Sequence, residues 1–113
     1  MQLELERQPQ ALVARLVGEL DHHSAGDIRA QIDEALMQER FPMVVLELSG
    51  LTFMDSSGIG LIMGRYRLAR SLGSTLRVRG ASPRIETVIR LAGMDNLPLW
   101  DDERTEKDHE TCQ

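Results

Sequence analysis

The sequence has few of the residues that mark secreted or membrane proteins. It contains one cysteine, Cys112, among 113 residues, and 4% of its residues are aromatic. A lone cysteine excludes a framework of internal disulfides and fits a reducing compartment. No apolar run approaches the roughly 20 residues that a membrane span requires. The chain also does not open with a basic segment followed by an apolar one. We therefore expect a cytoplasmic protein that does not act on a membrane.

Charge is unevenly distributed along the chain. The net charge is −5, and six acidic residues lie between residues 101 and 110. Seven arginines lie between residues 65 and 90, where Glu86 is the one acidic residue. An acidic chain with few aromatic residues is a poor match for nucleic-acid binding. The arginines are expected either to be solvated or to form a docking face for an acidic partner.

Hydrophobic periodicity predicts an α/β fold. Alternating or continuous apolar residues predict strands over residues 1–7, 11–20, 43–48 and 74–80, with a short edge strand at 97–100. Helical spacing predicts three helices, which follow the second, third and fourth strands. Strand–helix–strand units with short links favour parallel pairing and right-handed crossovers. We expect a mixed, mostly parallel sheet of four to five strands, with an antiparallel N-terminal strand and helices packed on the sheet.

Local signals mark the ends of the predicted helices. Ser24 followed by Asp27 has the spacing of a capping arrangement at the start of the first helix. Ser82 and Pro83 predict the start of the third helix. Gly73 and Gly93 predict the ends of the second and third helices. Residues 1–100 form the predicted domain, and the acidic tail 101–113 is expected to be a frayed helix or disordered.

The segment "GIGLIMG" is rich in glycine but matches no nucleotide-binding loop. A dinucleotide fingerprint needs glycine where Met63 stands, and no Lys-Ser/Thr pair follows as in a phosphate-binding loop. Glycine in a helix interior costs roughly 1 kcal/mol relative to alanine. We expect Gly60 and Gly64 to let the helix approach the sheet, and Gly58 to keep the helix entrance free of side chains.

Two polar loops follow predicted strands. In "MDSSG", Asp55, Ser56 and Ser57 suit a helix start, and a serine there is well placed to carry a phosphate. The segment does not match the G-x-S-x-G nucleophile elbow of hydrolases, because Met54 stands where the first glycine is needed. In "ELDHHS", His22 and His23 lack a third metal ligand, so no metal is expected. Both loops should lie at the carboxyl edge of the sheet, where they would form a composite site.

The segments "LVGELDHHSA" and "VVLELSGLTFMDSSGIGLIMGRYRLAR" together resemble the anti-sigma factor antagonists of the STAS-domain family, and among them the sporulation type that acts on sigma F. The resemblance covers roughly residues 1–100. It implies a small β/α superhelical domain with a mixed sheet, and no enzymatic activity, catalytic residue or cofactor.

The resemblance also implies roles for particular residues. Ser56 matches the phosphorylated serine, and Asp21 matches a partner-contact position. The remaining residues implied in the same interface are His22, His23, Ser24, Asp55, Ser57, Gly58 and Ile59. The implied partner is an ATP-using anti-sigma factor serine kinase, which binds the unphosphorylated antagonist, releases its sigma factor and phosphorylates Ser56. A PP2C-type phosphatase would reverse the modification.

Two alternatives stay open from the sequence. One is a STAS module of another partner-switching pathway, such as a stress response. The other is a small nucleotide-binding protein that uses the glycine-rich segment. Residue spacing alone does not choose between Ser56 and Ser57.

Overall fold

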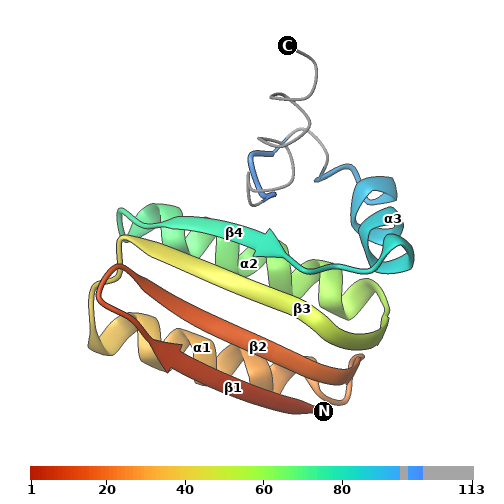
Figure 1. Ribbon diagram of the computed structural model, residues 1–113, viewed down its shortest axis with the longest axis horizontal. Helices are drawn as coiled ribbons and strands as arrows, with labels where there is room; N and C mark the ends of the chain where they lie inside the picture. The colour runs from red at the N-terminus through yellow and green to blue at the C-terminus, as the bar shows by residue number, and fades with distance from the viewer. Residues whose placement is uncertain (95–96, 101–113) are drawn as a thin grey trace.

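The computed structural model describes residues 1–94 and 97–100 of the chain (Figure 1). Its elements, in order, are β1 (Gln2–Arg7), β2 (Ala11–Leu20), α1 (Ala25–Gln38), β3 (Met43–Met54), α2 (Ser56–Ser71), β4 (Thr75–Arg79) and α3 (Pro83–Leu91). This order confirms the predicted α/β fold. The predicted tail lies outside the described residues.

The four strands form one mixed sheet in the order β1-β2-β3-β4. β1 and β2 pair antiparallel, whereas β2–β3 and β3–β4 pair parallel, as predicted (Figure 1). The expected edge strand at 97–100 is reduced to a single parallel bridge between Val78 and Trp100. Pro98, which has no N–H for a ladder, limits pairing there.

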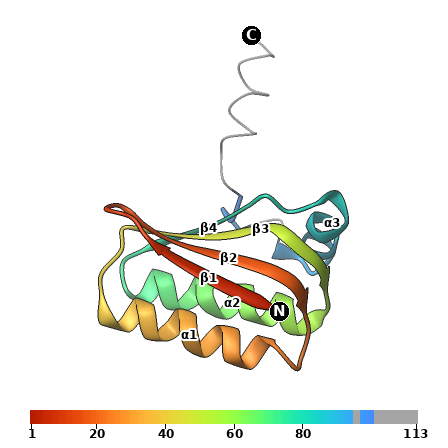
Figure 2. The same cartoon turned by 60° about the horizontal axis from the view of Figure 1, so that its bottom comes forward.

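The helices α1 and α2 lie side by side under one face of the sheet, and α3 lies apart from them beyond the end of β4 (Figures 1 and 2). The core fills the space between this face and the two helices. Its fully buried side chains include Leu12, Leu16, Leu46, Leu48, Ile32 and Ile62. The other face carries ion pairs, among them Arg15–Glu6 at 2.7 Å and Arg79–Glu47 at 2.8 Å.

β3 is longer than the sequence predicted. The predicted strand ended at residue 48, but residues 49–54 continue it to Met54 and bury Leu51 and Met54. Gly50 pairs with Val17, and a Cβ at Gly50 would lie 2.9 Å from Val17 Cγ2. The register of β2 and β3 shifts between Arg15 and Val17. Gly50 therefore permits a close approach of strands at an irregularity and does not make a turn.

Two glycines and one serine end or begin helices as predicted. Gly73 and Gly93 have φ values of +80° and +85°, the left-handed conformation that follows a helix end. Ser82 Oγ accepts a hydrogen bond from the Ile85 N–H at 3.2 Å, and Pro83 follows it as the first residue of α3.

Candidate functional site

The two polar loops lie next to each other at the carboxyl edge of the sheet. β2 and β3 are parallel, and their last paired residues are Leu20 and Met54. The Asp55 N–H donates to the Leu20 carbonyl at 3.2 Å, which joins the end of β2 to the start of α2. The loop after β2 and the beginning of α2 therefore form one surface (Figure 1).

The β2–α1 loop is held by hydrogen bonds among its own residues. Asp21 Oδ1 accepts from the backbone N–H groups of His23 and Ser24 at 3.0 and 3.2 Å. Ser24 Oγ accepts from the Asp21 N–H at 3.1 Å and donates to the Glu19 carbonyl at 3.1 Å. Burial acts to raise the pKa of Asp21, but these hydrogen bonds prevail and hold that pKa below its ordinary value of 3.8.

The first helix begins after Ser24 as predicted, but the expected capping hydrogen bond of the Ser24 side chain is absent. Ser24 occupies the N-cap position of α1, yet its side chain makes no hydrogen bond to the helix. Its hydroxyl is engaged with Asp21 and Glu19 instead. Asp27, the expected partner, is exposed and accepts from Gln31 Nε2 at 2.9 Å. The competing turn, which uses the same hydroxyl, outweighs the cap.

His22 and His23 project outward from this loop. Both are exposed, and their ring centroids lie 3.9 Å apart. Within residues 1–94 and 97–100, no group of three His, Cys, Asp or Glu residues is placed to hold a metal ion. The pair therefore belongs to the surface that the loop presents to solvent.

Asp55 caps the start of α2, and the two serines that follow it differ in exposure. Its Oδ1 accepts from the Ser57 N–H at 2.8 Å, which makes Asp55 the N-cap of α2. The predicted helix start is thereby confirmed, and the structure selects Asp55 among the three polar residues. Ser56 is the first residue of the helix and is exposed, whereas Ser57 is half-buried. The Ser56 hydroxyl thus stands in solvent at the positive end of the helix dipole.

The glycines of α2 act in the reverse of the way that the sequence predicted. Gly58 is buried, and a Cβ there would collide with Met54 Cγ and lie 3.0 Å from Leu20 Cδ2. At Gly60 and Gly64 an added Cβ would meet nothing within 4 Å. Gly58 therefore allows the close contact with the sheet, while the other two face open space.

A buried arginine, which was not predicted from the sequence, lies at the α1–α2 contact. Arg65 is 7% exposed, and its Nε lies 2.7 Å from Asp33 Oδ1 on α1. The approach is an ion pair without hydrogen-bond alignment, and among the described residues Nη1 of Arg65 has no hydrogen-bond partner. Helical spacing could have predicted its burial, because Arg65 lies three residues after Ile62 and four before Ala69, both on the buried face.

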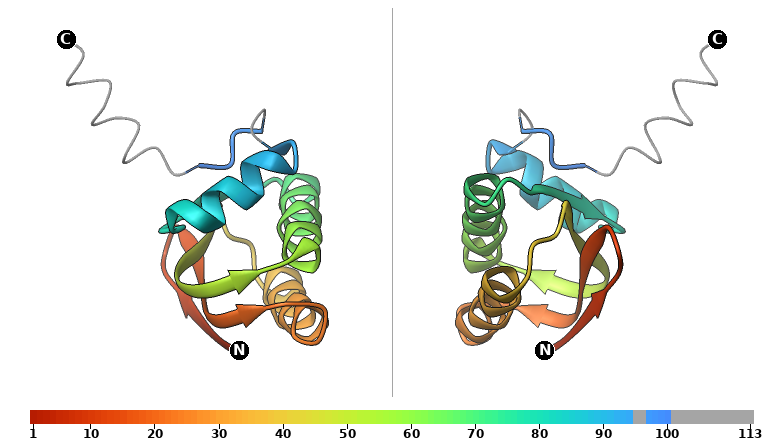
Figure 3. Two further views of the ribbon diagram at one scale, coloured as in Figure 1. Left: turned by 90° about the vertical axis from the view of Figure 1, so that its right-hand side faces the viewer. Right: turned by 90° about the vertical axis from the view of Figure 1, so that its left-hand side faces the viewer.

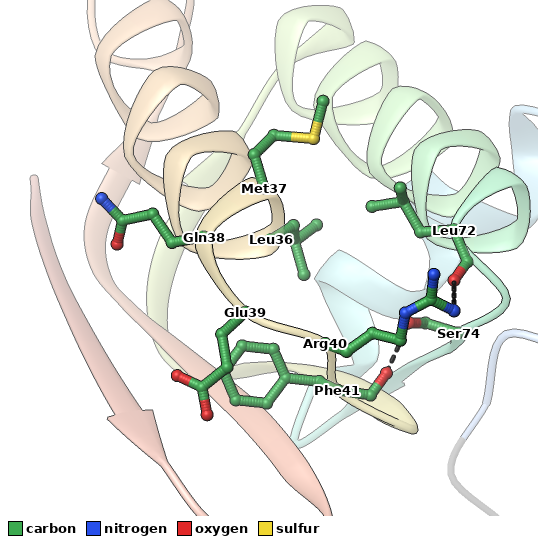
Figure 4. A pocket seen from close by; sticks show the side chains of 8 residues that line it. All are labelled: Leu36, Met37, Gln38, Glu39, Arg40, Phe41, Leu72 and Ser74. Atoms are coloured by element: carbon green, nitrogen blue, oxygen red, sulfur yellow. Dashed lines mark hydrogen bonds between the residues drawn. The ribbon is translucent and has the colours of Figure 1, made fainter.

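A separate hollow lies at the far ends of the same helices, away from Ser56. It is lined by Leu36, Met37, Gln38, Glu39, Arg40, Phe41, Leu72 and Ser74 (Figure 4). Arg40 Nη1 donates to the Leu72 carbonyl at 3.4 Å, and Ser74 Oγ donates to the Phe41 carbonyl. These hydrogen bonds join the segments that follow α1 and α2. The polar groups there therefore hold the two segments together, and we assign the hollow no binding role.

None of the helices among residues 1–94 and 97–100 is both long enough and apolar enough to cross a membrane.

Comparison with known proteins identifies the family. The STAS domain model matches residues 2–111. The anti-sigma F factor antagonist of Paenibacillus polymyxa is 38% identical over 104 residues, which are 91% of this chain and 89% of the relative.

Two solved structures carry the same fold. The anti-sigma factor antagonist SpoIIAA in its unphosphorylated form superposes with a TM-score of 0.77 at 31% identity, over 99% of this chain and 98% of the other. The Bacillus cell fate determinant SpoIIAA in its phosphorylated form superposes with a TM-score of 0.70 at 32% identity, over 96% and 98%. These matches confirm the resemblance that the two loop motifs indicated, and the chain belongs to the STAS domain family.

Proposed function

We propose that the protein is a non-enzymatic anti-sigma factor antagonist that phosphorylation switches off. The unphosphorylated form binds an anti-sigma factor serine kinase through the Asp21–Ser24 loop and the start of α2, and the kinase releases its sigma factor. The kinase then uses ATP to phosphorylate Ser56, which ends binding, and a PP2C-type phosphatase restores the active form. These reactions take place in the cytoplasm, and the antagonist itself needs no cofactor.

One observation carries the proposal: Ser56 is an exposed hydroxyl at the first position of α2, next to the Asp21 loop. A hydroxyl that a kinase modifies must reach the kinase active site, and exposure on a helix end permits this. The relatives support the same reading, because SpoIIAA is known in an unphosphorylated and a phosphorylated form.

The local environment favours Ser56 over Ser57 as the acceptor. Ser57 is half-buried, and its N–H is bound to Asp55 Oδ1. Gly58 behind it is pressed against Met54, so the backbone at Ser57 cannot move outward without disturbing this contact. Ser56 can accept a phosphate without any such rearrangement.

A phosphate on Ser56 opposes partner binding while leaving the helix intact. It adds about −1.5 to −2 charges at neutral pH. The free N–H groups and the dipole at the helix start tolerate that charge. The partner would instead contact a bulky anion beside Asp21 and Asp55. Charge repulsion and steric crowding would therefore weaken binding of the partner.

Binding measurements with charge variants test the proposal. Ser56→Asp should weaken the affinity for the anti-sigma factor about a hundredfold, which corresponds to about 2.8 kcal/mol. Ser56→Ala should bind as the wild type does and should resist inactivation by kinase and ATP. Gln38→Glu, which adds one negative charge at the far end of α1, is the matched control and should bind normally.

The proposal fails if Ser56→Asp and Ser56→Ala both bind as the wild type does and kinase with ATP labels neither Ser56 nor Ser57. Recovery of a stress-response anti-sigma factor in affinity capture would point to the other partner-switching pathway.

A further inference from the structure

A groove runs between α1 and α2, next to the proposed phosphorylation site. It is lined from α1 by Ala25, Gly26 and Arg29, and from α2 by Ser57, Gly60, Leu61, Gly64 and Arg65. The two helices lie side by side in both end-on views (Figure 3). Ser57 follows Ser56 directly, so the groove begins where the surface around Ser56 ends.

The groove is open because three of its positions carry no side chain. An added Cβ would meet nothing within 4 Å at Gly26, Gly60 or Gly64. Gly60 and Gly64 lie in the interior of α2, where each costs the helix roughly 1 kcal/mol relative to alanine. No contact within the described residues accounts for glycine at these places, unlike Gly58, whose packing against Met54 does. The free space is therefore available to a group from outside the chain.

The charge of the groove is positive. Arg29 is exposed on α1, and Arg65 is 7% exposed. Nη1 of Arg65 finds no hydrogen-bond partner in residues 1–94 and 97–100. Burial lowers the pKa of Arg65, Asp33 opposes this effect, and the nearby charge of Arg29 adds to it. Asp33 pairs with Arg65 at 2.7 Å, whereas Arg29 acts on Arg65 as a like charge. An anion placed between the two guanidinium groups would offset their repulsion.

We propose that this groove receives an aspartate or glutamate side chain of the anti-sigma factor, which Arg29 and Arg65 bind. The inference rests on the proposed function, since it adds a second contact to the same complex. Guanidinium groups are the side chains best suited to bind a carboxylate with paired hydrogen bonds. Gly26, Gly60 and Gly64 carry no side chains, so a partner helix or loop can come close enough to place that carboxylate between α1 and α2.

Two variants of the full chain test the groove by different means. Arg29→Glu reverses its exposed charge, and Gly60→Leu fills its free space; both should weaken binding of the anti-sigma factor at least tenfold. Arg29→Lys keeps the charge but loses the paired hydrogen bonds of the guanidinium, so it should weaken binding less than Arg29→Glu does. Arg67→Glu, which changes an exposed arginine of α2 outside the groove, is the matched control and should stay within about threefold of the wild type.

Urea denaturation of each variant separates loss of binding from loss of folding. Because space is open at Gly60 and Arg29 is exposed, both variants should unfold no more readily than the wild type. If a variant unfolds early, Gly60→Ala and Arg29→Gln provide the milder changes, each with a smaller loss of affinity expected in the same direction.

The outcomes distinguish this inference from the proposed function. If Ser56→Asp abolishes binding but Arg29→Glu and Gly60→Leu bind as the wild type does, the groove is not part of the interface and only this inference falls. If Arg67→Glu weakens binding as much as Arg29→Glu, the effect is general electrostatics and the inference also falls. If the wild type does not bind the anti-sigma factor at all, both proposals fail.

Discussion

Gly58 and Gly60 stand two residues apart in α2 and have opposite surroundings. The sequence marked both as unusual, because each weakens a helix. It could not say which one contacts the sheet, since that depends on how α2 rotates about its axis over β3. The buried positions Leu61, Ile62, Tyr66 and Ala69 set that rotation, and Gly58 falls on their face.

Alanine should therefore have opposite effects at the two glycines. Gly58→Ala places a methyl group against Met54 Sδ at 2.7 Å and should lower the free energy of unfolding by about 1–3 kcal/mol. Gly60→Ala meets open space and should raise it by up to about 1 kcal/mol through helix propensity. Urea denaturation of both variants checks this. Equal effects of the same sign would contradict the placement of α2.

Asp21 gives the site loop a pH dependence. Its pKa is lower in the folded chain than its ordinary value of 3.8. A carboxyl shifted downward stabilises the fold at pH values above its unfolded pKa, and this contribution is lost as the pH falls through the folded pKa.

An aspartate ordinarily titrates between about pH 5 and about pH 3. Over this range the free energy of unfolding of the wild type should fall more than that of Asp21→Asn. The asparagine oxygen can still accept the two backbone hydrogen bonds but does not titrate. Urea denaturation at several pH values measures the difference. Parallel pH profiles for the two proteins would show that the loop does not depend on the carboxylate.

At the scale of the elements, hydrophobic periodicity predicted which face of a helix is buried. It did not predict features that depend on contacts with a neighbouring strand. Ile28, Ile32, Ala35 and Leu36 recur at helical spacing in the sequence, and all four are buried on α1. The extension of β3 beyond residue 48 was missed, because it depends on pairing with β2, where Gly50 closely approaches Val17. The cap at Ser24 was misassigned for the same reason: its hydroxyl binds Glu19 at the end of β2.

The contact between α1 and α2 depends in part on the Arg65–Asp33 ion pair. Arg65 is nearly buried, whereas the Asp33 side chain is 33% exposed. Asp33→Ala would leave a buried guanidinium without its anion, and we expect a loss of about 2 kcal/mol in the free energy of unfolding. The double variant Asp33→Leu with Arg65→Met should recover most of that loss. If Asp33→Ala unfolds like the wild type, the pair does not hold the two helices together.

At the scale of the whole molecule, the parallel pairing of β2 and β3 creates the site. Parallel strands end at the same edge, so the loops after Leu20 and Met54 meet although these two residues are 34 positions apart in the sequence. This placement was predictable from the order of elements, since strand–helix–strand units pair in parallel. The α1–α2 groove was not predictable, because it depends on the distance between two helices.

A negative charge at residue 56 should leave this fold unchanged. Ser56→Asp places a carboxylate at the start of α2, where the helix dipole favours it, and should raise the free energy of unfolding by about 0.3–1 kcal/mol. Thermal denaturation, with circular dichroism for helix content, measures the effect. A large loss of stability would mean that phosphorylation acts by unfolding the antagonist and not by blocking its interface.

The most direct test of the phosphorylation switch is to map the modified residue. The wild-type chain is incubated with the cognate anti-sigma factor and ATP, and its intact mass and phosphopeptides are then determined by mass spectrometry. We predict one added phosphate, located on Ser56, and none on Ser56→Ala. A phosphate on Ser57, or no phosphate on a chain that binds the kinase, would contradict the account.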